Sequence, residues 1–396
     1  MSDSSSREHH DNRDQAAGSP GTHADGWQGA HSATASASVS SRPGVSSDDR
    51  QKQRRNLVAG LIGALVATIL SLIFVSSFIG ALHEPGPRSA PVGIVGPPAS
   101  ASRLGSTLDH AVPGGYIVTS YPTATAARNA INDRTIDAAL VPGPHGQNLV
   151  VAQAVGSGLT NATVKVFAGL AARAHVPLAV TDIRPLHASD PQGLSQNFFV
   201  IALLAPSFLF GNQLTSRIAP KLGPHGHLAV LAVYAAIVAA VAVAIADGAI
   251  GALTGAPWGL FGIGTLLAFA ASVIGAAAAR WAGGIGVALF GLLFIPVGIA
   301  SSGVTLGPNM ITPWYADLGK ALPAGSALPA VLNTTYFHAN AITTPLLILS
   351  AWALAGILAL ALAAILHAPI PGQQPPAEQA TDAAARRLAP AHRANA

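Results

Sequence analysis

The sequence predicts an α-helical integral membrane protein with six transmembrane helices and an extracytoplasmic α/β domain inserted between helices 1 and 2. Of its 396 residues, 50% are hydrophobic and 10% are charged, whereas soluble globular domains carry about 25% charged residues. Apolar runs long enough to cross a bilayer recur along the chain. Basic residues gather at the ends of these runs, on one side of the membrane.

Composition excludes several classes of site. The chain has no cysteine, so disulfides, thiolate metal sites and cysteine nucleophiles are impossible. The net charge of +4 does not indicate nucleic-acid binding, because the basic residues cluster only at membrane flanks. The abundance of alanine, glycine and proline is typical of a GC-rich bacterial genome.

The first predicted helix covers residues 56–82 and follows a basic cluster that contains Arg54 and Arg55. A cleaved signal peptide also begins with a basic flank, but its apolar region is about 7 to 15 residues long. No charged residue occurs from Leu57 to Leu82, and about 20 apolar residues span a bilayer. The segment is therefore predicted to stay as a membrane anchor.

Two tails flank the predicted folded part. Residues 1–55 and 368–396 are poor in large apolar side chains, and such segments cannot bury enough surface to offset the entropy of ordering. We predict that both tails are disordered and cytosolic.

Residues 83–195 are predicted to form the α/β domain. The order is strand PVGIVG, helix SASRLGSTLDHAV, strand GYIVTSY, a helix that begins at a threonine cap in TATAARNAINDRT, strands IDAALVPG and NLVVAQAVG, and helix TNATVKVFAGLAARAH. Alternating strands and helices are typical of a partly parallel sheet.

The membrane domain is predicted over residues 196–367. Its helices 2 to 6 are expected at about 197–213, 227–246, 258–279, 283–304 and 345–366. Pro296 is expected to kink the fifth helix or to split it into half-helices.

Loop charges predict the orientation. Lysine and arginine favour cytoplasmic loops, and with the N-terminus in the cytosol all the basic clusters fall on that side if every helix crosses. Both termini are then cytosolic, the α/β domain is external, and the protein lies in the cytoplasmic (inner) membrane. The clusters are Arg50, Lys52, Arg54 and Arg55; Arg217 and Lys221; Arg280; and Arg386, Arg387 and Arg393.

The segment 311–340 lies on the external side before the last helix. Its apolar stretches are too short to span and are interrupted by Pro313, Pro323 and Pro329, which predicts short re-entrant or interfacial helices. A plain external loop with an aromatic belt is the alternative. The aromatic residues Trp314, Tyr315, Tyr336 and Phe337 suit a membrane interface.

Motifs for energy conversion and catalysis are missing. The sequence contains no P-loop, no G-x-S-x-G elbow and no H-E-x-x-H motif. The predicted spans carry no charged residue in their interiors, where ion-coupled transporters usually place one. Asp109, His110, Asp182, His187 and Asp190 have no spacing that demands a triad or a metal site. We expect no enzyme activity, cofactor or metal.

Small residues dominate several spans, as in GAAAARWAGGIGVALFG from Gly275 to Gly291. Small side chains let helix backbones approach closely, and this close packing holds helices together in lipid. We therefore predict tight helix contacts in this region.

A junction motif, D-x-x-P followed by D-P-x-G, leads from the α/β domain into the second helix. With one span, an external α/β domain and then five spans, the chain resembles the membrane subunits of type-2 ABC exporters, closest to the phage-infection-protein (Pip) group. TATAARNAINDRTIDAALVPG and PWYADLGKALPAGSALPAVLNTTYF are similar to that family's external domain and re-entrant segment. The matching residues are Asp182, Pro185, Asp190, Pro191 and Gly193 at the junction, and Pro313, Trp314, Tyr315, Pro323 and Tyr336 in the re-entrant segment.

The resemblance implies a homodimeric permease that exports an apolar or amphipathic substrate. A separate ABC ATPase subunit would grip the cytosolic loop from Gln213 to His227, with Arg217 and Lys221 as contacts. Such exporters often carry an amphipathic helix before the first span, but DDRQKQRRN has no apolar face. The alternative is a non-transporting membrane receptor or secretion-system accessory protein whose external domain binds a partner.

Overall fold

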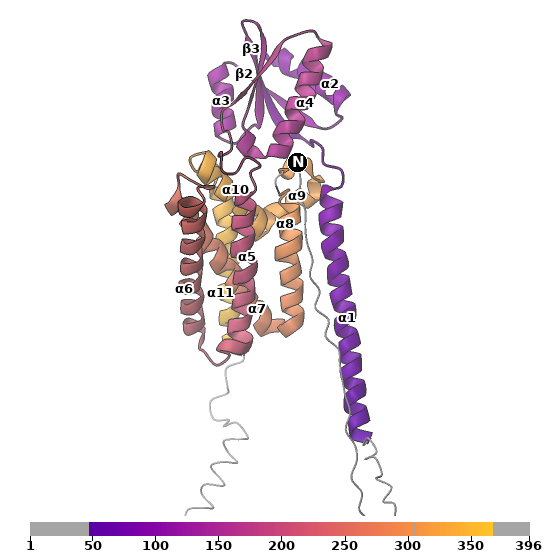
Figure 1. Cartoon of the computed structure of the whole chain (residues 1–396), viewed down its shortest axis with the longest axis vertical. Coiled ribbons are helices and arrows are strands. Elements are labelled where there is room, and N and C mark those ends of the chain that lie inside the picture. The colour runs from indigo at the N-terminus through magenta and orange to yellow at the C-terminus, as the bar shows by residue number, and fades with distance from the viewer. Residues whose placement is uncertain (1–46, 305, 367–396) are drawn as a thin grey trace, which may run out of the picture. The chain divides into compact units, whose positions relative to one another are not determined.

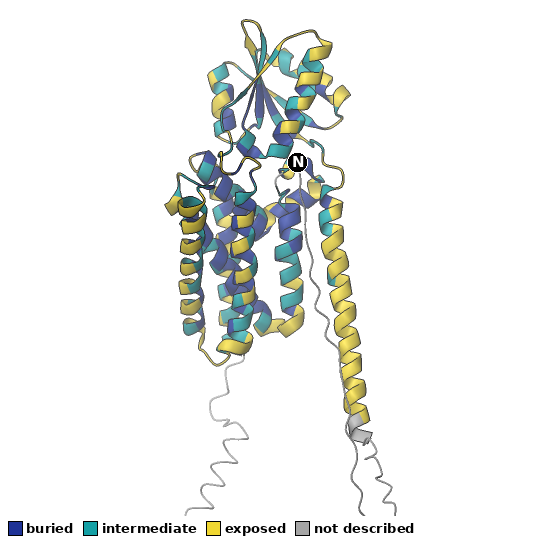
Figure 2. Ribbon diagram, in the orientation of Figure 1, coloured by how far each residue is buried: buried dark blue, intermediate teal, exposed yellow. Residues whose placement is uncertain are grey.

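The computed structural model describes residues 47–304 and 306–366. The predicted disordered tails lie outside these residues, apart from 47–55. Helix α1 (Ser47–Leu82) includes that stretch and so begins before the predicted start at residue 56. Most of its large apolar side chains are exposed (Figure 2), as expected for a helix that faces lipid. At its end, Ala81 packs against Ala300 and Tyr315.

Among the described residues, five helices are long and apolar enough to cross a membrane, which indicates a multi-pass membrane protein. They are Arg50–Leu82, Ser195–Ile218, Pro224–Ala249, Pro257–Ser301 and Thr343–Leu366.

Three of these spans contain π-helical turns. Pro296 lies in one of them, where the wider turn accommodates a residue that has no backbone N–H to donate. The spans are built from α5 (Ser195–Gln213) with η2 (Leu214–Ile218), α6 (Pro224–Val243) with η3 (Ala244–Ala249), α7 (Pro257–Leu292) with η4 (Leu293–Val297) and α8 (Gly298–Ser301), and α11 (Thr343–Leu366).

Helix α7 is interrupted at Gly283, whose φ of 53° and ψ of −136° are not helical. Side chains at Gly275 and at Gly291 would both contact Phe208 of α5. In a straight helix these two glycines would lie about 24 Å apart, so the chain turns back at Gly283 (Figure 1). The sequence predicts two separate helices here, 258–279 and 283–304, and the interruption lies at the start of the second.

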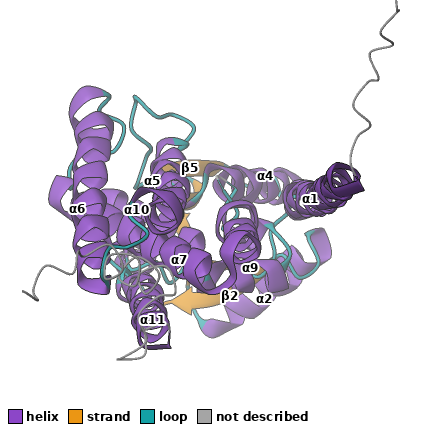
Figure 3. Ribbon diagram, turned by 90° about the horizontal axis from the view of Figure 1, so that it is seen from below, coloured by secondary structure: helices purple, strands orange, loops and turns teal. Residues whose placement is uncertain are grey.

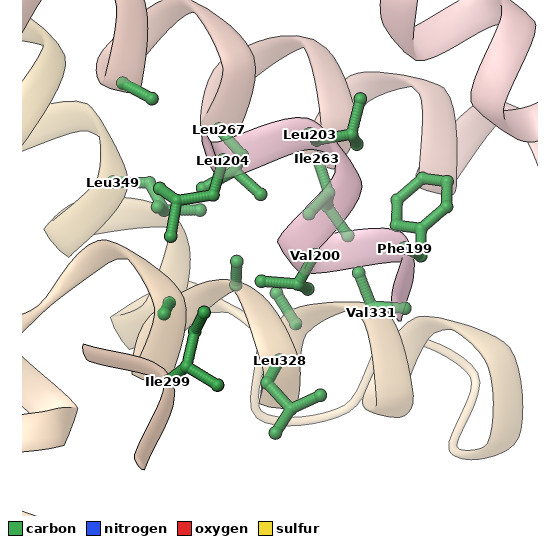
Figure 4. Close-up of a cluster of buried hydrophobic side chains, with 14 of the residues drawn as sticks. Phe199, Val200, Leu203, Leu204, Ile263, Leu267, Ile299, Leu328, Val331 and Leu349 are labelled. Carbon is green, nitrogen blue, oxygen red and sulfur yellow. The ribbon is translucent and has the colours of Figure 1, made fainter. Parts of the chain in front are cut away.

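Helix α7 forms the centre of the bundle and packs against α5, α6 and α11 (Figure 3). A Cβ atom at Gly211 would overlap the carbonyl oxygen of Ser272, and one at Gly275 would overlap that of Phe208. The predicted close approach through small residues therefore occurs between α5 and α7. Leu203, Leu204, Leu267 and other apolar side chains fill the core beside it (Figure 4).

The segment between α1 and α5 forms a mixed α/β domain. Its sheet has the order β2-β1-β3-β4-β5, in which only the β3–β4 pair is antiparallel. Thr123 caps α3 by accepting a hydrogen bond from the Ala126 N–H. The elements are β1 (Ala90–Val95), α2 (Pro98–Ala111), β2 (Tyr116–Tyr121), α3 (Ala124–Asn132), β3 (Ala138–Gly143), β4 (Gly146–Val151), η1 (Gln153–Val155), α4 (Ser157–Arg173) and β5 (Leu178–Asp182).

The two faces of the sheet are covered differently. Leu108 of α2 and Phe167 of α4 pack on one face, against Val92 and Leu149. Helix α3 covers part of the other face through Ile131. Edge strand β5 is not among the predicted elements, because PLAVTD is a short run whose outer side chains are partly exposed.

Between α8 and α11 lie η5 (Pro308–Met310), α9 (Pro313–Ala321) and α10 (Pro323–Tyr336). Pro313 and Pro323 each stand at the first position of a helix, which suits proline. The prediction that Pro329 interrupts the segment is wrong, because α10 continues through it. With 14 residues, α10 is about 21 Å long and cannot span about 30 Å of hydrocarbon.

Candidate functional site

Helix α10 belongs to two hydrophobic cores at once. Its first part, including Ala327 and Val331, packs in the helical bundle with Leu203. Its end, including Leu332 and Tyr336, packs in the core of the α/β domain with Ile131. This helix therefore connects the α/β domain to the helical bundle.

Phe337, directly after α10, is 0% exposed, and two arginines of the α/β domain lie close to its ring. The guanidinium carbons of Arg134 and Arg184 lie 4.8 and 6.0 Å from its ring centroid. Cations this close to an aromatic face are attracted by the ring's quadrupole. The ring is thus held by packing and by charge.

Hydrogen bonds cross the same junction. Arg134 donates from Nε to Asn333 Oδ1 at 3.1 Å. Within the α/β domain, Arg184 donates from Nε to Asn132 Oδ1 at 3.0 Å. The side-chain amide of Asn340 donates to the Asn132 carbonyl oxygen at 3.0 Å. Apolar packing, cation–π contacts and hydrogen bonds therefore join the loop after α3 to the end of α10.

Arg134 and Asp137 form an ion pair beneath this junction, with 3.5 Å between Nη1 and Oδ1. Burial raises the pKa of Asp137 from its ordinary value of about 3.8 to about 6, although the Arg134 guanidinium opposes this rise. Burial also lowers the pKa of Arg134. The cost of removing both charges from water thus exceeds their attraction.

We expect the stability of this junction to fall as the pH rises from about 4 to about 6. The folded state holds the Asp137 proton more tightly than the unfolded chain, so stability is highest below the unfolded pKa and is lost through the folded one. The loss is at most about 3 kcal/mol. Thermal unfolding in detergent at pH 4.5, 5.5 and 7 measures it, and Asp137→Asn should flatten the profile. If the stability of that variant depended on pH as steeply as that of the wild type, Asp137 would not be the group responsible.

The predicted external junction residues extend from Asp182, the last residue of β5, to Gly193, shortly before α5. Asp182 Oδ1 accepts from the backbone N–H groups of Gln153 and Arg184. The buried Asp190 accepts from those of Leu194 and Ser195, both at 2.9 Å, and its charge suits the N-terminus of α5. These carboxylates therefore fix the chain path into the second span.

Gly193 has a φ of 66°, and a side chain there would press on Leu186 and Gln196. This backbone conformation is one that glycine adopts without strain. Pro185 and Pro191 are exposed. The backbone conformation and the close neighbours explain why position 193 is a glycine. Nothing in the structure explains why positions 185 and 191 are prolines.

The re-entrant residues divide into two groups. Trp314 is 68% exposed, as expected for a side chain at a membrane interface. Tyr315 is buried and its hydroxyl hydrogen-bonds to Ser77 of α1. Tyr336 and Phe337 are buried in the α/β core. The prediction that all four aromatic side chains face the interface is therefore wrong for Tyr315, Tyr336 and Phe337.

A cavity of about 250 Å³ lies beside this junction. Arg134 and Lys320 contribute the cationic groups that line it, and Ser301 and Ser302 contribute hydroxyl groups. The remaining lining is small and apolar and comes from the segment after α8, from α9 and α10, and from Val155 and Gly156 of the α/β domain. Arg134 pairs with Asp137, and Lys320 Nζ lies 2.8 Å from Asp317 Oδ1. Because both cations already have an anionic partner, the chamber suits an apolar or amphipathic molecule.

Arg217 and Lys221 lie elsewhere, in and after the π-helical turn that ends the second span. Both side chains are exposed, and the connection to α6 is the short segment Ala219–Gly223. Tyr336 of the predicted re-entrant segment lies beside His187 of the junction segment, whereas Tyr315 contacts Ser77 of α1. Arg217 and Lys221 are exposed at a separate place.

Sequence reasoning missed Arg134, Asn333 and Asn340. Arg134 has a φ of 64°, an uncommon conformation for a residue other than glycine, and no local pattern marks it. His187 stacks near Tyr336, with 5.0 Å between ring centroids. Within residues 47–304 and 306–366, no group of three histidine or acidic residues is placed to hold a metal ion.

A scan against protein-family models finds no match for this chain, and a search of curated proteins finds no similar sequence.

Proposed function

We propose that this chain is the membrane-spanning permease subunit of an ABC-2-type exporter. It passes an apolar or amphipathic substrate across the cytoplasmic membrane, with energy from a separate ATPase, and it acts as a homodimer. In this proposal α7 crosses the membrane twice with its turn at Gly283, which gives six crossings, cytosolic termini and an external α/β domain.

The observation that carries the proposal is the position of α10. One short helix packs in both the bundle core and the α/β core, next to a cavity of about 250 Å³. A movement of the bundle would therefore displace the α/β domain and change the cavity together. Such coupling is what a transporter needs to link an ATPase on one side to substrate release on the other.

The cytosolic end offers the matching contact. Arg217 and Lys221 are exposed, and neither takes part in an ion pair among the described residues. The segment that contains Arg217 and Lys221 follows α5 directly through η2. Because α5 approaches α7 closely at Gly211, a displacement of this segment by a bound ATPase would also displace the bundle.

A second candidate function rests on a different observation. A groove of about 780 Å³ runs between α2 and α4 on the α/β domain and is lined mainly by apolar residues such as Leu104 and Leu170. A receptor or secretion-system accessory protein would use such a groove to bind a partner.

Reversing charge in Arg217→Glu with Lys221→Glu is expected to abolish co-purification of an ATPase and vanadate-sensitive ATP hydrolysis. The measurement is purification from the native membrane in mild detergent, mass spectrometry of bound proteins, and an ATPase assay. The control, Arg103→Glu with Lys165→Glu, makes the same charge change on exposed positions of the α/β domain. Envelope partners without any ATPase would support the receptor function instead.

A further inference from the structure

A small cavity of about 90 Å³ lies where the ends of four helical segments meet. Its lining comes from the end of the second span, the start of α6, the turn region of α7 and the end of α11. The lining residues are Thr215, Pro220, Leu222, Pro224, His227, Arg280, Leu360 and Ala364. Five of these residues belong to the segment Gln213–His227 that the permease function would use to contact an ATPase, but that function gives the cavity itself no role.

Two buried polar atoms in this lining have no hydrogen-bond partner in the described part of the chain: Thr215 Oγ1 and His227 Nε2. His227 is 7% exposed, and its Nδ1 lies 2.8 Å from the Leu222 carbonyl oxygen. A carbonyl only accepts, so Nδ1 carries the proton of that bond, and Nε2 is left as an acceptor for a hydroxyl or another donor of a ligand. Burying polar atoms unpaired is costly, so these two indicate a bound polar group.

The charge of the lining indicates an anion. Arg280 contributes a guanidinium group, and no acidic residue lines the cavity. The planar fork of arginine matches the oxygens of a phosphate. One water needs about 10–15 Å³ of such a cavity, so a volume of about 90 Å³ leaves room for a phosphate group.

The cavity lies at the level where membrane spans end. Ile218 and Leu366 end two of the spans and Pro224 begins a third. Trp281, next to Arg280, donates from Nε1 to the Ala359 carbonyl oxygen at 2.9 Å, and tryptophan is enriched at the membrane–water interface. Lipid phosphates occupy this same level.

The rest of the lining is mostly apolar and reaches the surface. Leu360 and Ala364 line the cavity and are themselves partly exposed. A lipid could place its phosphate against Arg280 and its acyl chains against these two side chains. A free phosphate would gain nothing from this apolar wall.

We propose that this cavity binds the phosphate group of an anionic membrane lipid through Arg280 and Thr215, while His227 Nε2 accepts a hydrogen bond from a hydroxyl of the lipid headgroup. The lipid would hold α6, α7 and α11 together at this end of the bundle. The proposal does not depend on the export function.

The test uses the full chain in nanodiscs of phosphatidylcholine with or without phosphatidylglycerol, and native mass spectrometry counts the retained lipids. Thr215→Val with Arg280→Gln should weaken phosphatidylglycerol retention by roughly tenfold or more, since hydrogen bonds to charged groups carry this much binding energy. The matched control is Arg217→Gln with Lys221→Gln, which removes two nearby exposed cations that do not line the cavity. It should retain the lipid like the wild type.

Three results would overturn the proposal. Equal retention in the wild type and the Thr215–Arg280 variant would show that the lipid binds elsewhere. Equal loss in the control variant would show that general surface charge holds it. A rise in melting temperature with inorganic phosphate that matches the rise with phosphatidylglycerol would assign the site to a free anion. Melting curves of all variants in phosphatidylcholine alone establish that they are folded.

Discussion

Replacing Gly211 or Gly275 by alanine is expected to prevent tight packing of α5 on α7 and to destabilise the helical bundle strongly. The added Cβ would overlap a backbone carbonyl oxygen in each case, that of Ser272 for Gly211 and that of Phe208 for Gly275. Overpacking a core costs about 1–3 kcal/mol and occasionally more. Because a backbone atom cannot move aside as a side chain can, we expect each change to reach at least about 3 kcal/mol.

The matched control is Gly262→Ala on α7, the helix that also contains Gly275. A Cβ atom at Gly262 would have no atom within 4 Å. Alanine is favoured over glycine in a helix by roughly 0.5–1 kcal/mol, so this variant should be as stable as the wild type or slightly more stable. Thermal unfolding in one detergent and size-exclusion chromatography measure the difference. If the Gly275→Ala variant had the same melting temperature as the wild type, the close approach of α5 and α7 would be contradicted.

Phe337→Ala is expected to release the α/β domain from α10. The ring is fully buried, and the guanidinium groups of Arg134 and Arg184 lie close to it. Truncating a buried phenylalanine costs about 3–5 kcal/mol, and the two arginines would also lose their cation–π partner. Limited proteolysis should then cut between β5 and α5 in the variant and leave the wild type intact.

Phe198→Ala is the matched control, because Phe198 is 63% exposed on α5 and a change there should alter stability by no more than about 0.5 kcal/mol. A second variant, Phe337→Leu, keeps most of the buried volume but removes the aromatic face. An intermediate loss would separate packing from cation–π attraction. If Phe337→Ala melts and resists protease like the wild type, α10 does not hold the α/β domain.

If the glycine variants and Phe337→Ala behave as expected, two contacts connect the second span to the α/β domain. The first joins α5 to α7 at Gly211 and Gly275, and the second joins α10 to the α/β domain at Phe337. Helix α10 also packs on α5 and α7, so a shift of the bundle would reach the α/β domain through this helix. Export would depend on both contacts, whereas a receptor would need only a stable α/β domain.

The apolar helices and most elements of the α/β domain were predictable from the sequence. An apolar run of about 20 residues is a local property, and it requires a membrane whatever the rest of the chain does. The Thr123 cap is local in the same way, because its hydrogen bond reaches only to Ala126. The close approach near Gly275 also follows from a pattern of small residues along one segment.

The tertiary structure alone decided which surfaces meet. Tyr336 ends a short apolar helix and Phe337 follows it, so both look like interface residues, but the α/β core covers them. Arg134 becomes a junction residue only because Asn333 and Phe337, about 200 positions away, lie against it. Likewise, the cavity at Arg280 needs the ends of separate helices to meet. Hydrophobicity along a chain determines that a side chain is removed from water, whereas the partner that covers it depends on long-range packing.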